Sequence, residues 1–186
     1  FLISSASTTG GLMLAFHLPF GNAAAAQTPG ASLAPAVPSA GTPEVNAWVV
    51  IKPDDTVIVR IARSEMGQGT LTGLAQLVAE ELECDWSKVT TEYPTPGQSV
   101  ARKRVWGDFS TGGSRGIRES HDYVRRGGVV ARTMLIQAAA DEWKVPASEC
   151  RAASSVITHL PTGRTTTYGK VADAAEYNGS EMQLEA

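Results

Sequence analysis

The stretch RSEMGQGTLTGLAQLVAEEL, residues 63–82, places two glycines around one glutamine directly before a segment with helical periodicity. Apolar residues recur there at intervals of three and four, which predicts a helix from about Thr70 to Glu83 with one buried face. Gly67 and Gly69 lose backbone entropy on folding, so they indicate either a tight turn or a backbone that another group approaches closely. This stretch alone leaves both interpretations open.

A second segment repeats the arrangement. Residues 110–143, STGGSRGIRESHDYVRRGGVVARTMLIQAAADEW, predict a glycine-rich turn followed by a long helix from near Ile117 to about Trp143. The first turn of a helix presents unpaired N–H groups and the positive end of the helix dipole, which suit an anion. Structural capping explains most glycine turns before helices, but two in one domain favour a bulky anionic cofactor.

We call residues 66–69 loop 1 and residues 111–115 loop 2. The glycines let a ligand approach the backbone, the glutamine amide can donate and accept, and the hydroxyls and the arginine of loop 2 add donors and charge. The candidate binding residues are Met66, Gly67, Gln68 and Gly69 in loop 1, and Thr111, Gly112, Gly113, Ser114 and Arg115 in loop 2.

The remaining segments predict an α+β fold in which β-hairpins accompany the two main helices. Alternating apolar residues predict a hairpin of residues 47–51 and 56–62, a short strand at 89–93 and a second hairpin about residues 161–163. Residues 94–110 are expected to form a long polar loop, tethered by Trp106 and Phe109. Gly127, Gly128 and Ala131 form a smooth patch on the second helix, where another element can pack closely.

Composition excludes some classes of function. The chain has 186 residues, 42% of them hydrophobic, which suits one domain, and its net charge of −3 gives no electrostatic case for nucleic acid. Cys84 and Cys150 could form one disulfide, but two buried free thiols are favoured. His121 and His159 have no partners at metal-ligand spacing. We therefore expect no catalytic set and no metal ligands in this chain.

The N-terminal part reads as an export sequence. Residues 1–26 combine an apolar region at 12–20 with an alanine-rich cleavage site, which predicts the later part of a signal and a periplasmic protein. An ordinary N-terminal tail is the alternative. Residues 27–44 form a Pro/Ala-rich linker, residues 45–176 the folded domain and residues 177–186 a polar tail.

The two glycine segments resemble the molybdenum hydroxylases, the xanthine dehydrogenase and aldehyde oxidase family. SEMGQGTLTGLAQLVAEEL and STGGSRGIRESHDYVRRGGVVARTML, in this order, are similar to the N-terminal segment of the large, molybdopterin-binding subunits of the isoquinoline 1-oxidoreductase and bacterial aldehyde dehydrogenase type. The resemblance covers roughly residues 45–175. The leader is also similar to the twin-arginine export signals of that group.

The resemblance implies a molybdopterin cytosine dinucleotide cofactor with molybdenum, with loop 1 along the pterin and metal end and loop 2 at pterin or pyrophosphate oxygens. It also implies hydroxylation of an aldehyde or an N-heterocycle, such as isoquinoline or nicotinate, with water as the oxygen source. Expected partners are the remainder of the large subunit, a small [2Fe-2S] subunit and a membrane-bound cytochrome c at the outer face of the inner membrane.

The family's glutamate base lies near the far C-terminus of longer subunits, so we expect it outside these residues. The alternative hypothesis is a non-catalytic truncated or accessory module that binds a partner protein through the patch from Gly127 to Ala131.

Overall fold

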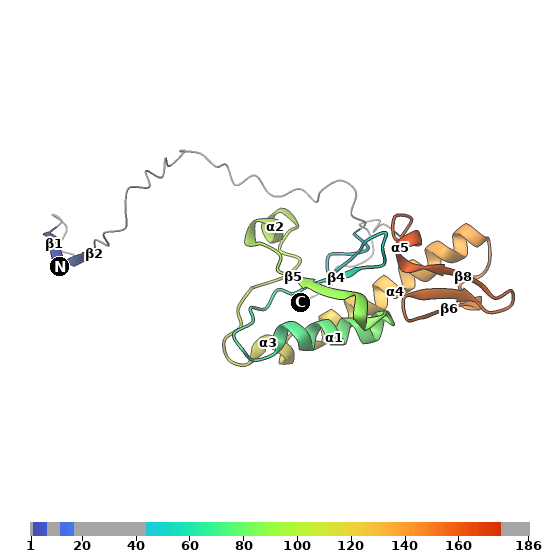
Figure 1. Cartoon of the computed structure of the whole chain (residues 1–186), viewed down its shortest axis with the longest axis horizontal. Helices are drawn as coiled ribbons and strands as arrows, with labels where there is room; N and C mark the ends of the chain where they lie inside the picture. The colour runs from blue at the N-terminus through green and yellow to red at the C-terminus, as the bar shows by residue number, and fades with distance from the viewer. Residues whose placement is uncertain (1, 7–11, 17–43, 176–186) are drawn as a thin grey trace. The chain divides into compact units, whose positions relative to one another are not determined.

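The computed structural model describes residues 2–6, 12–16 and 44–175 (Figure 1). The chain divides into two units, residues 1–34 and 35–186. In the first, β1 (Leu2–Ala6) pairs antiparallel with β2 (Leu12–Phe16). The rest of the expected export signal, residues 27–43 of the linker and the polar tail lie outside the described residues, so the signal stays a prediction.

The first sheet of the second unit contains the predicted hairpin and the predicted short strand. Its strand order is β3 (Val49–Ile51), β4 (Val57–Arg60) and β5 (Val89–Glu92). β3 is antiparallel to β4, whereas β4 is parallel to β5. A parallel pair needs a crossover connection, and α1 (Thr70–Leu82) and the short η1 (Trp86–Lys88) provide it. Loop 1 therefore lies between the end of β4 and the start of α1.

The second long helix packs against α1. α4 (His121–Trp143) carries the glycine patch, and a Cβ added at Gly128 would lie 2.7 Å from the carbonyl oxygen of Val78 on α1. A Cβ at Gly127 would lie 3.3 Å from the Trp48 side chain, and Ala131 is fully buried. The prediction of close packing is confirmed, but the chain's own elements cover the patch. The alternative hypothesis of a partner docking there is wrong for this reason.

Two expectations about the elements beside loop 2 are also wrong. The predicted loop of residues 94–110 contains a helix, α2 (Pro96–Ala101), whose start is fixed by a capping box between Thr95 and Gln98. The predicted continuous helix is split into α3 (Arg115–Arg118) and α4. The tether is confirmed, since Trp106 is buried and its Nε1 donates to the carbonyl oxygen of Ala47 at 3.0 Å, and Phe109 packs against the core.

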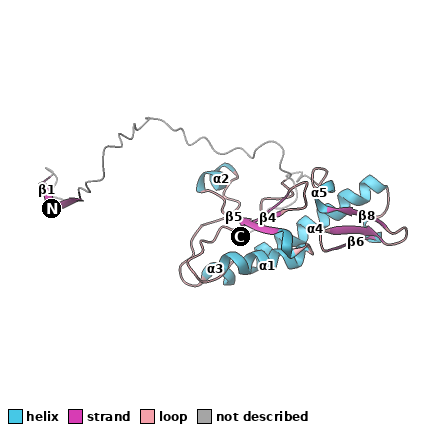
Figure 2. Cartoon of the chain, in the orientation of Figure 1, coloured by secondary structure: helices cyan, strands magenta, loops and turns pink. Residues whose placement is uncertain are grey.

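A second sheet follows α4 and the short η2 (Ala147–Glu149). It is antiparallel, in the order β6 (Cys150–Ala153), β7 (Val156–His159) and β8 (Arg164–Thr167), and α5 (Tyr168–Val171) comes next (Figure 2). The predicted hairpin about residues 161–163 is β7–β8, and β6 is a strand that the pattern did not predict. Two small sheets with helices confirm the α+β fold class.

The two cysteines are free, as predicted, but neither is fully buried. Burial still raises the pKa of Cys84 to about 11, so its thiol is not an activated nucleophile. Within the described ranges, no group of three His, Cys, Asp or Glu side chains could hold a metal ion. The described helices include none with both the length and the apolar character needed to cross a membrane.

Candidate functional site

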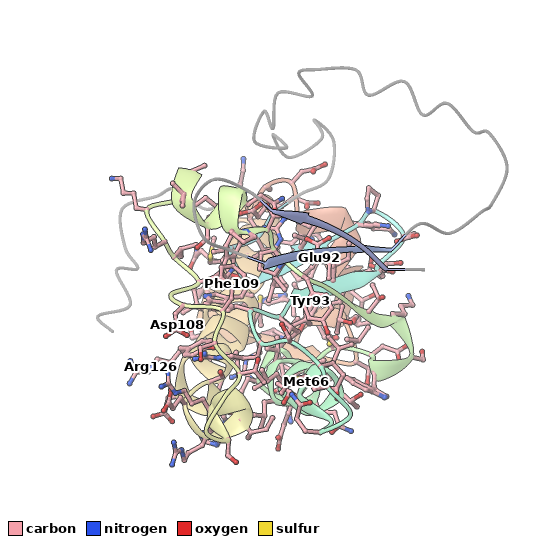
Figure 3. All side chains as sticks on the ribbon, turned by 90° about the vertical axis from the view of Figure 1, so that its left-hand side faces the viewer. Met66, Glu92, Tyr93, Asp108, Phe109 and Arg126 are labelled. Carbon is pink, nitrogen blue, oxygen red and sulfur yellow. The ribbon has the colours of Figure 1, made fainter. Side chains whose placement is uncertain are left out.

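Loop 1 and loop 2 lie side by side. The backbone N–H of Ser64, just before loop 1, donates to Thr111 Oγ1 in loop 2 at 2.9 Å, although 47 residues separate them. Figure 3, viewed from the left-hand side of Figure 1, labels Met66 of loop 1 and Asp108, which precedes loop 2. The structure thus brings together the two segments that the sequence singled out.

Loop 1 is closed by a residue that the sequence analysis missed, Glu65. Its Oε1 accepts from the N–H groups of Gly67 at 2.7 Å and Gly69 at 2.9 Å, and its Oε2 accepts from Leu71 N–H at 2.9 Å. The hydrogen bonds from Leu71 and Gly69 hold the pKa of Glu65 below its usual value. The expectation that loop 1 presents these donors to an anion is therefore wrong, because the chain's own carboxylate already uses them.

The amide of Gln68 is also used inside loop 1. Its Nε2 donates to the carbonyl oxygen of Ser64 and to Thr70 Oγ1, both at 2.8 Å, and its Oε1 accepts from Met66 N–H at 2.5 Å. Both hydrogens of the amide are committed, while the oxygen keeps a second lone pair. Gln68 can therefore accept from a ligand as it stands, but it donates only if one internal hydrogen bond breaks.

An apolar surface accompanies loop 1. The Met66 side chain is 72% exposed, and Tyr93, whose hydroxyl accepts from Glu65 N–H at 3.2 Å, is half-exposed. Both are labelled in Figure 3 on the face turned to the viewer. Large exposed apolar side chains that lie near one another often mark a binding surface.

Loop 2 is open where loop 1 is closed. Gly113 and Ser114 both have left-handed backbones, with φ of 66° and 57°. Ser114 precedes α3, and its side chain makes no capping hydrogen bond within the described structure. A Cβ added at Gly112 or Gly113 would meet no described atom within 4 Å, as is also true of Gly67 and Gly69 in loop 1, so the loops differ in hydrogen bonding and not in space. This backbone is accessible to a ligand, as the sequence analysis expected of Gly112 and Gly113.

The cationic side chains around loop 2 are only loosely paired. The Arg115 guanidinium lies 3.7 Å from Asp108 and 3.7 Å from Glu119, and it remains 42% exposed. Arg118 donates to the carbonyl oxygen of Gly113 at 3.3 Å. Exposed pairs of this kind contribute about 0–1 kcal/mol, so an anionic ligand can replace them at little cost.

The helices behind the two loops start in direct contact. A Cβ added at Gly116 in α3 would lie 2.6 Å from Thr70 Oγ1, and one at Gly73 would lie 3.0 Å from Ile117 Cδ1. These glycines therefore permit the close approach of α3 to α1. The glycines predicted to make room for a ligand, Gly67, Gly69, Gly112 and Gly113, are different residues, and a Cβ at any of them would meet no described atom within 4 Å.

Buried Arg63 also joins the two segments, through Asp108, Ser110 and Ser120, and the sequence analysis missed it. An arginine directly before a glycine loop carried no local signal, because its partners lie far along the chain.

Comparisons with known proteins identify the family of this chain. Residues 20–186 match the sequence model of the molybdopterin cofactor-binding domain. The chain is 34% identical over 139 residues to isoquinoline 1-oxidoreductase subunit beta of Brevundimonas diminuta, an alignment that covers 74% of this chain and 18% of that protein. It is 33% identical over 135 residues to the membrane-bound aldehyde dehydrogenase (pyrroloquinoline-quinone) of Gluconacetobacter polyoxogenes, covering 73% and 16%.

The chain thus spans less than a fifth of the length of either curated relative. Among solved structures, the Cu,Mo-CO dehydrogenase in its carbon monoxide reduced state shares the fold, with a TM-score of 0.53 at 20% identity over 68% of this chain and 15% of that one. With a family match over residues 20–186 and two relatives above 30% identity, this chain belongs to the molybdopterin cofactor-binding domain family.

Proposed function

We propose that this chain forms part of the large subunit of a molybdenum hydroxylase and that its two loops hold a molybdopterin cytosine dinucleotide. The observation that carries the proposal is the pairing of loop 1 with loop 2 at one end of the domain through Ser64 and Thr111. The family match supports the pterin and the molybdenum. The cytosine nucleotide goes beyond what this match supports, so it is measured separately.

The residues present fit such a cofactor in a definite orientation. Loop 2 has an open backbone and half-exposed Arg115, so it suits the pyrophosphate oxygens. Loop 1 does not suit a phosphate, because the Glu65 carboxylate occupies its donors and would repel another negative charge. The acceptor oxygen of Gln68 and the exposed Met66 suit the neutral, polar and flat pterin. The cofactor would thus place its pterin at loop 1 and its pyrophosphate at loop 2.

The chain's own contribution is binding and orientation. When bound, the molybdenum centre supplies the two-electron redox chemistry that no protein side chain provides. We assign no catalytic residue to this chain and place the family's glutamate base in the remainder of the subunit. We further propose that electrons pass to a [2Fe-2S] subunit and then to a membrane-bound cytochrome c.

The substrate class and the location are part of the same proposal. One relative is named for isoquinoline and the other for aldehydes. The proposed substrates therefore include both aldehydes and N-heterocycles. The name of the second relative includes "membrane-bound". Together with the signal-like N-terminus, this name supports a periplasmic enzyme at the outer face of the inner membrane.

The proposal is tested on the native complex that contains this chain within its full-length subunit. Metal analysis, nucleotide release and intact mass, measured on one preparation, should find molybdenum, a cytosine nucleotide and the iron–sulfur partner together. Turnover assays with benzaldehyde and with isoquinoline then separate the two substrate classes. A fully active preparation without molybdenum would reject the proposal.

A further inference from the structure

Arg63 is a buried cation whose hydrogen bonds all reach towards loop 2. It is 7% exposed and follows β4, just before loop 1. Its Nε donates to Ser120 Oγ at 3.0 Å, while its Nη1 donates to Asp108 Oδ1 at 2.9 Å and to the carbonyl oxygen of Ser110. The planar guanidinium carries these donors in a fixed fork, which a lysine ammonium cannot reproduce.

The three partners bracket loop 2. Asp108 and Ser110 precede it, and Ser120 follows it at the junction of α3 and α4. Asp108 Oδ1 also accepts from Ser110 N–H at 3.0 Å, and Tyr123 donates to Ser120 Oγ at 2.6 Å, so the partners are themselves oriented. A single side chain at the start of loop 1 therefore holds both ends of the segment that contains loop 2.

The other links between the loops are weaker. Ser64 and Thr111 are joined by neutral hydrogen bonds that are exposed to solvent. Bonds from a charged donor contribute about twice as much as neutral ones. The bond from Arg63 to Ser120 is also buried, while those to Asp108 and Ser110 are partly buried. Arg63 thus supplies the charged hydrogen bonds between the two segments, in addition to the packing of α3 against α1.

Arg60 provides an internal comparison. It lies three residues earlier and is equally buried, at 8% exposed, and it pairs with Glu44 and Glu92 at 2.7 Å each. Its guanidinium also lies 5.8 Å from the centroid of the Trp106 ring. These partners secure the sheet and α2, and none of them belongs to loop 1 or loop 2. The two arginines therefore share burial and charge but differ in what they hold.

We propose that Arg63 is a positioning residue that sets the separation of loop 1 and loop 2 and thereby the retention of the cofactor. The inference rests on the proposed function. Arg63 acts through loop 2 and not on the ligand, because its side chain is only 8% exposed. Replacing it should therefore change how long the cofactor stays bound and leave the turnover of each loaded site intact.

The test compares Arg63→Lys with Arg60→Lys in the full-length subunit within its native complex. For each variant we would measure molybdenum content, the rate of pterin release without substrate, thermal stability, and amide hydrogen exchange of residues 107–114. Arg63→Lys should release the pterin about tenfold faster or more, which corresponds to the loss of one charge-assisted bond. Its amides in residues 107–114 should exchange faster, while kcat per bound molybdenum and KM stay at wild-type values.

Arg60→Lys should lower thermal stability by a similar amount and leave the pterin release rate and loop 2 exchange unchanged. Equal acceleration of release in both variants, or none in Arg63→Lys, would overturn the inference. A wild-type complex without molybdopterin would instead overturn the proposed function.

If Arg63→Lys fails to accumulate as folded subunit, Asp108→Asn provides a second variant. The Asp108 side chain is 63% exposed, so a polar atom introduced at this position can bond to water. We expect about threefold faster pterin release from this change, since one of the three partners of Arg63 is weakened. A wild-type release rate in Asp108→Asn would also count against the inference.

Discussion

Loop 1 and loop 2 both place two glycines before a helix, but they are held in opposite ways. Backbone N–H groups in and beside loop 1 already donate to the side chains of Glu65 and Gln68, and the Gln68 amide donates to the carbonyl oxygen of Ser64. Loop 2 is held from outside by Arg63, and within the described structure the side chain of Ser114 does not cap the helix that follows. Glycines before a helix therefore do not by themselves make an anion site. The backbone N–H donors at such a site are available to an anion only where no nearby carboxylate already accepts from them.

The largest effect should come from separating the helices behind the loops. Gly116→Ala would place a Cβ 2.6 Å from Thr70 Oγ1, so we expect a loss of about 2 kcal/mol from overpacking, and weaker retention of the cofactor. Thermal unfolding of the full-length subunit measures the loss. Combining Gly116→Ala with Thr70→Ala removes the clashing atoms and should recover part of it.

The control for Gly116→Ala is Gly97→Ala in α2. There the nearest described atom to an added Cβ lies 3.9 Å away, so the change should be neutral or stabilising by about 0.5–1 kcal/mol. Equal destabilisation by the two alanines would mean that the contact between α3 and α1 is not what brings the loops together.

A smaller effect is expected where loop 2 is open. Gly113→Val puts a branched side chain at φ of 66° and into the space of the ligand, at a cost of about 1–2 kcal/mol in stability. Gly163→Val, at φ of 70° in the β7–β8 turn, imposes the same strain far from the loops in sequence. Molybdenum content should fall severalfold only in Gly113→Val. If both variants keep the wild-type content, the assignment of loop 2 is wrong.

The internal cap of loop 1 should show a pH dependence. Backbone hydrogen bonds lower the folded-state pKa of Glu65, so the stabilisation is complete above the unfolded value of about 4.3. It is lost as pH falls through the lower folded-state pKa. Glu65→Gln should therefore be less stable than wild type near pH 6, by a modest margin that shrinks towards pH 3. Thermal melts across this range give the difference, and a margin independent of pH would contradict the cap.

The smallest effect on stability is expected from Gln68→Ala. It removes three hydrogen bonds in and beside loop 1, two of them exposed and the one to Thr70 partly buried. We therefore expect a loss of about 1 kcal/mol, together with lower molybdenum content or turnover. Gln76→Ala, on the exposed side of α1, is the matched control. If the two variants have the same molybdenum content and rate, loop 1 does not contact the cofactor.

The elements with strong periodicity were predicted well from sequence. α1, the β3–β4 hairpin and the β7–β8 hairpin follow local patterns of apolar residues and turns. α2 escaped prediction because its six residues are too few to show a helical period. The break between α3 and α4 was missed because Ser120 is held by Arg63, a contact 57 residues away.

The candidate site divides in the same way. The two glycine loops and the start of α1 are specified locally, because backbone freedom at glycine and the spacing of apolar residues depend only on neighbours in the chain. How far one loop lies from the other depends on side chains that meet only in the folded chain. Glu65 closes loop 1 locally, through backbone N–H groups of Gly67, Gly69 and Leu71. Arg63 instead reaches Asp108 and Ser110, which lie 45 and 47 residues further along the chain. Long-range hydrogen bonds leave no periodic trace in a sequence, so only the tertiary structure decided how the two loops lie relative to each other.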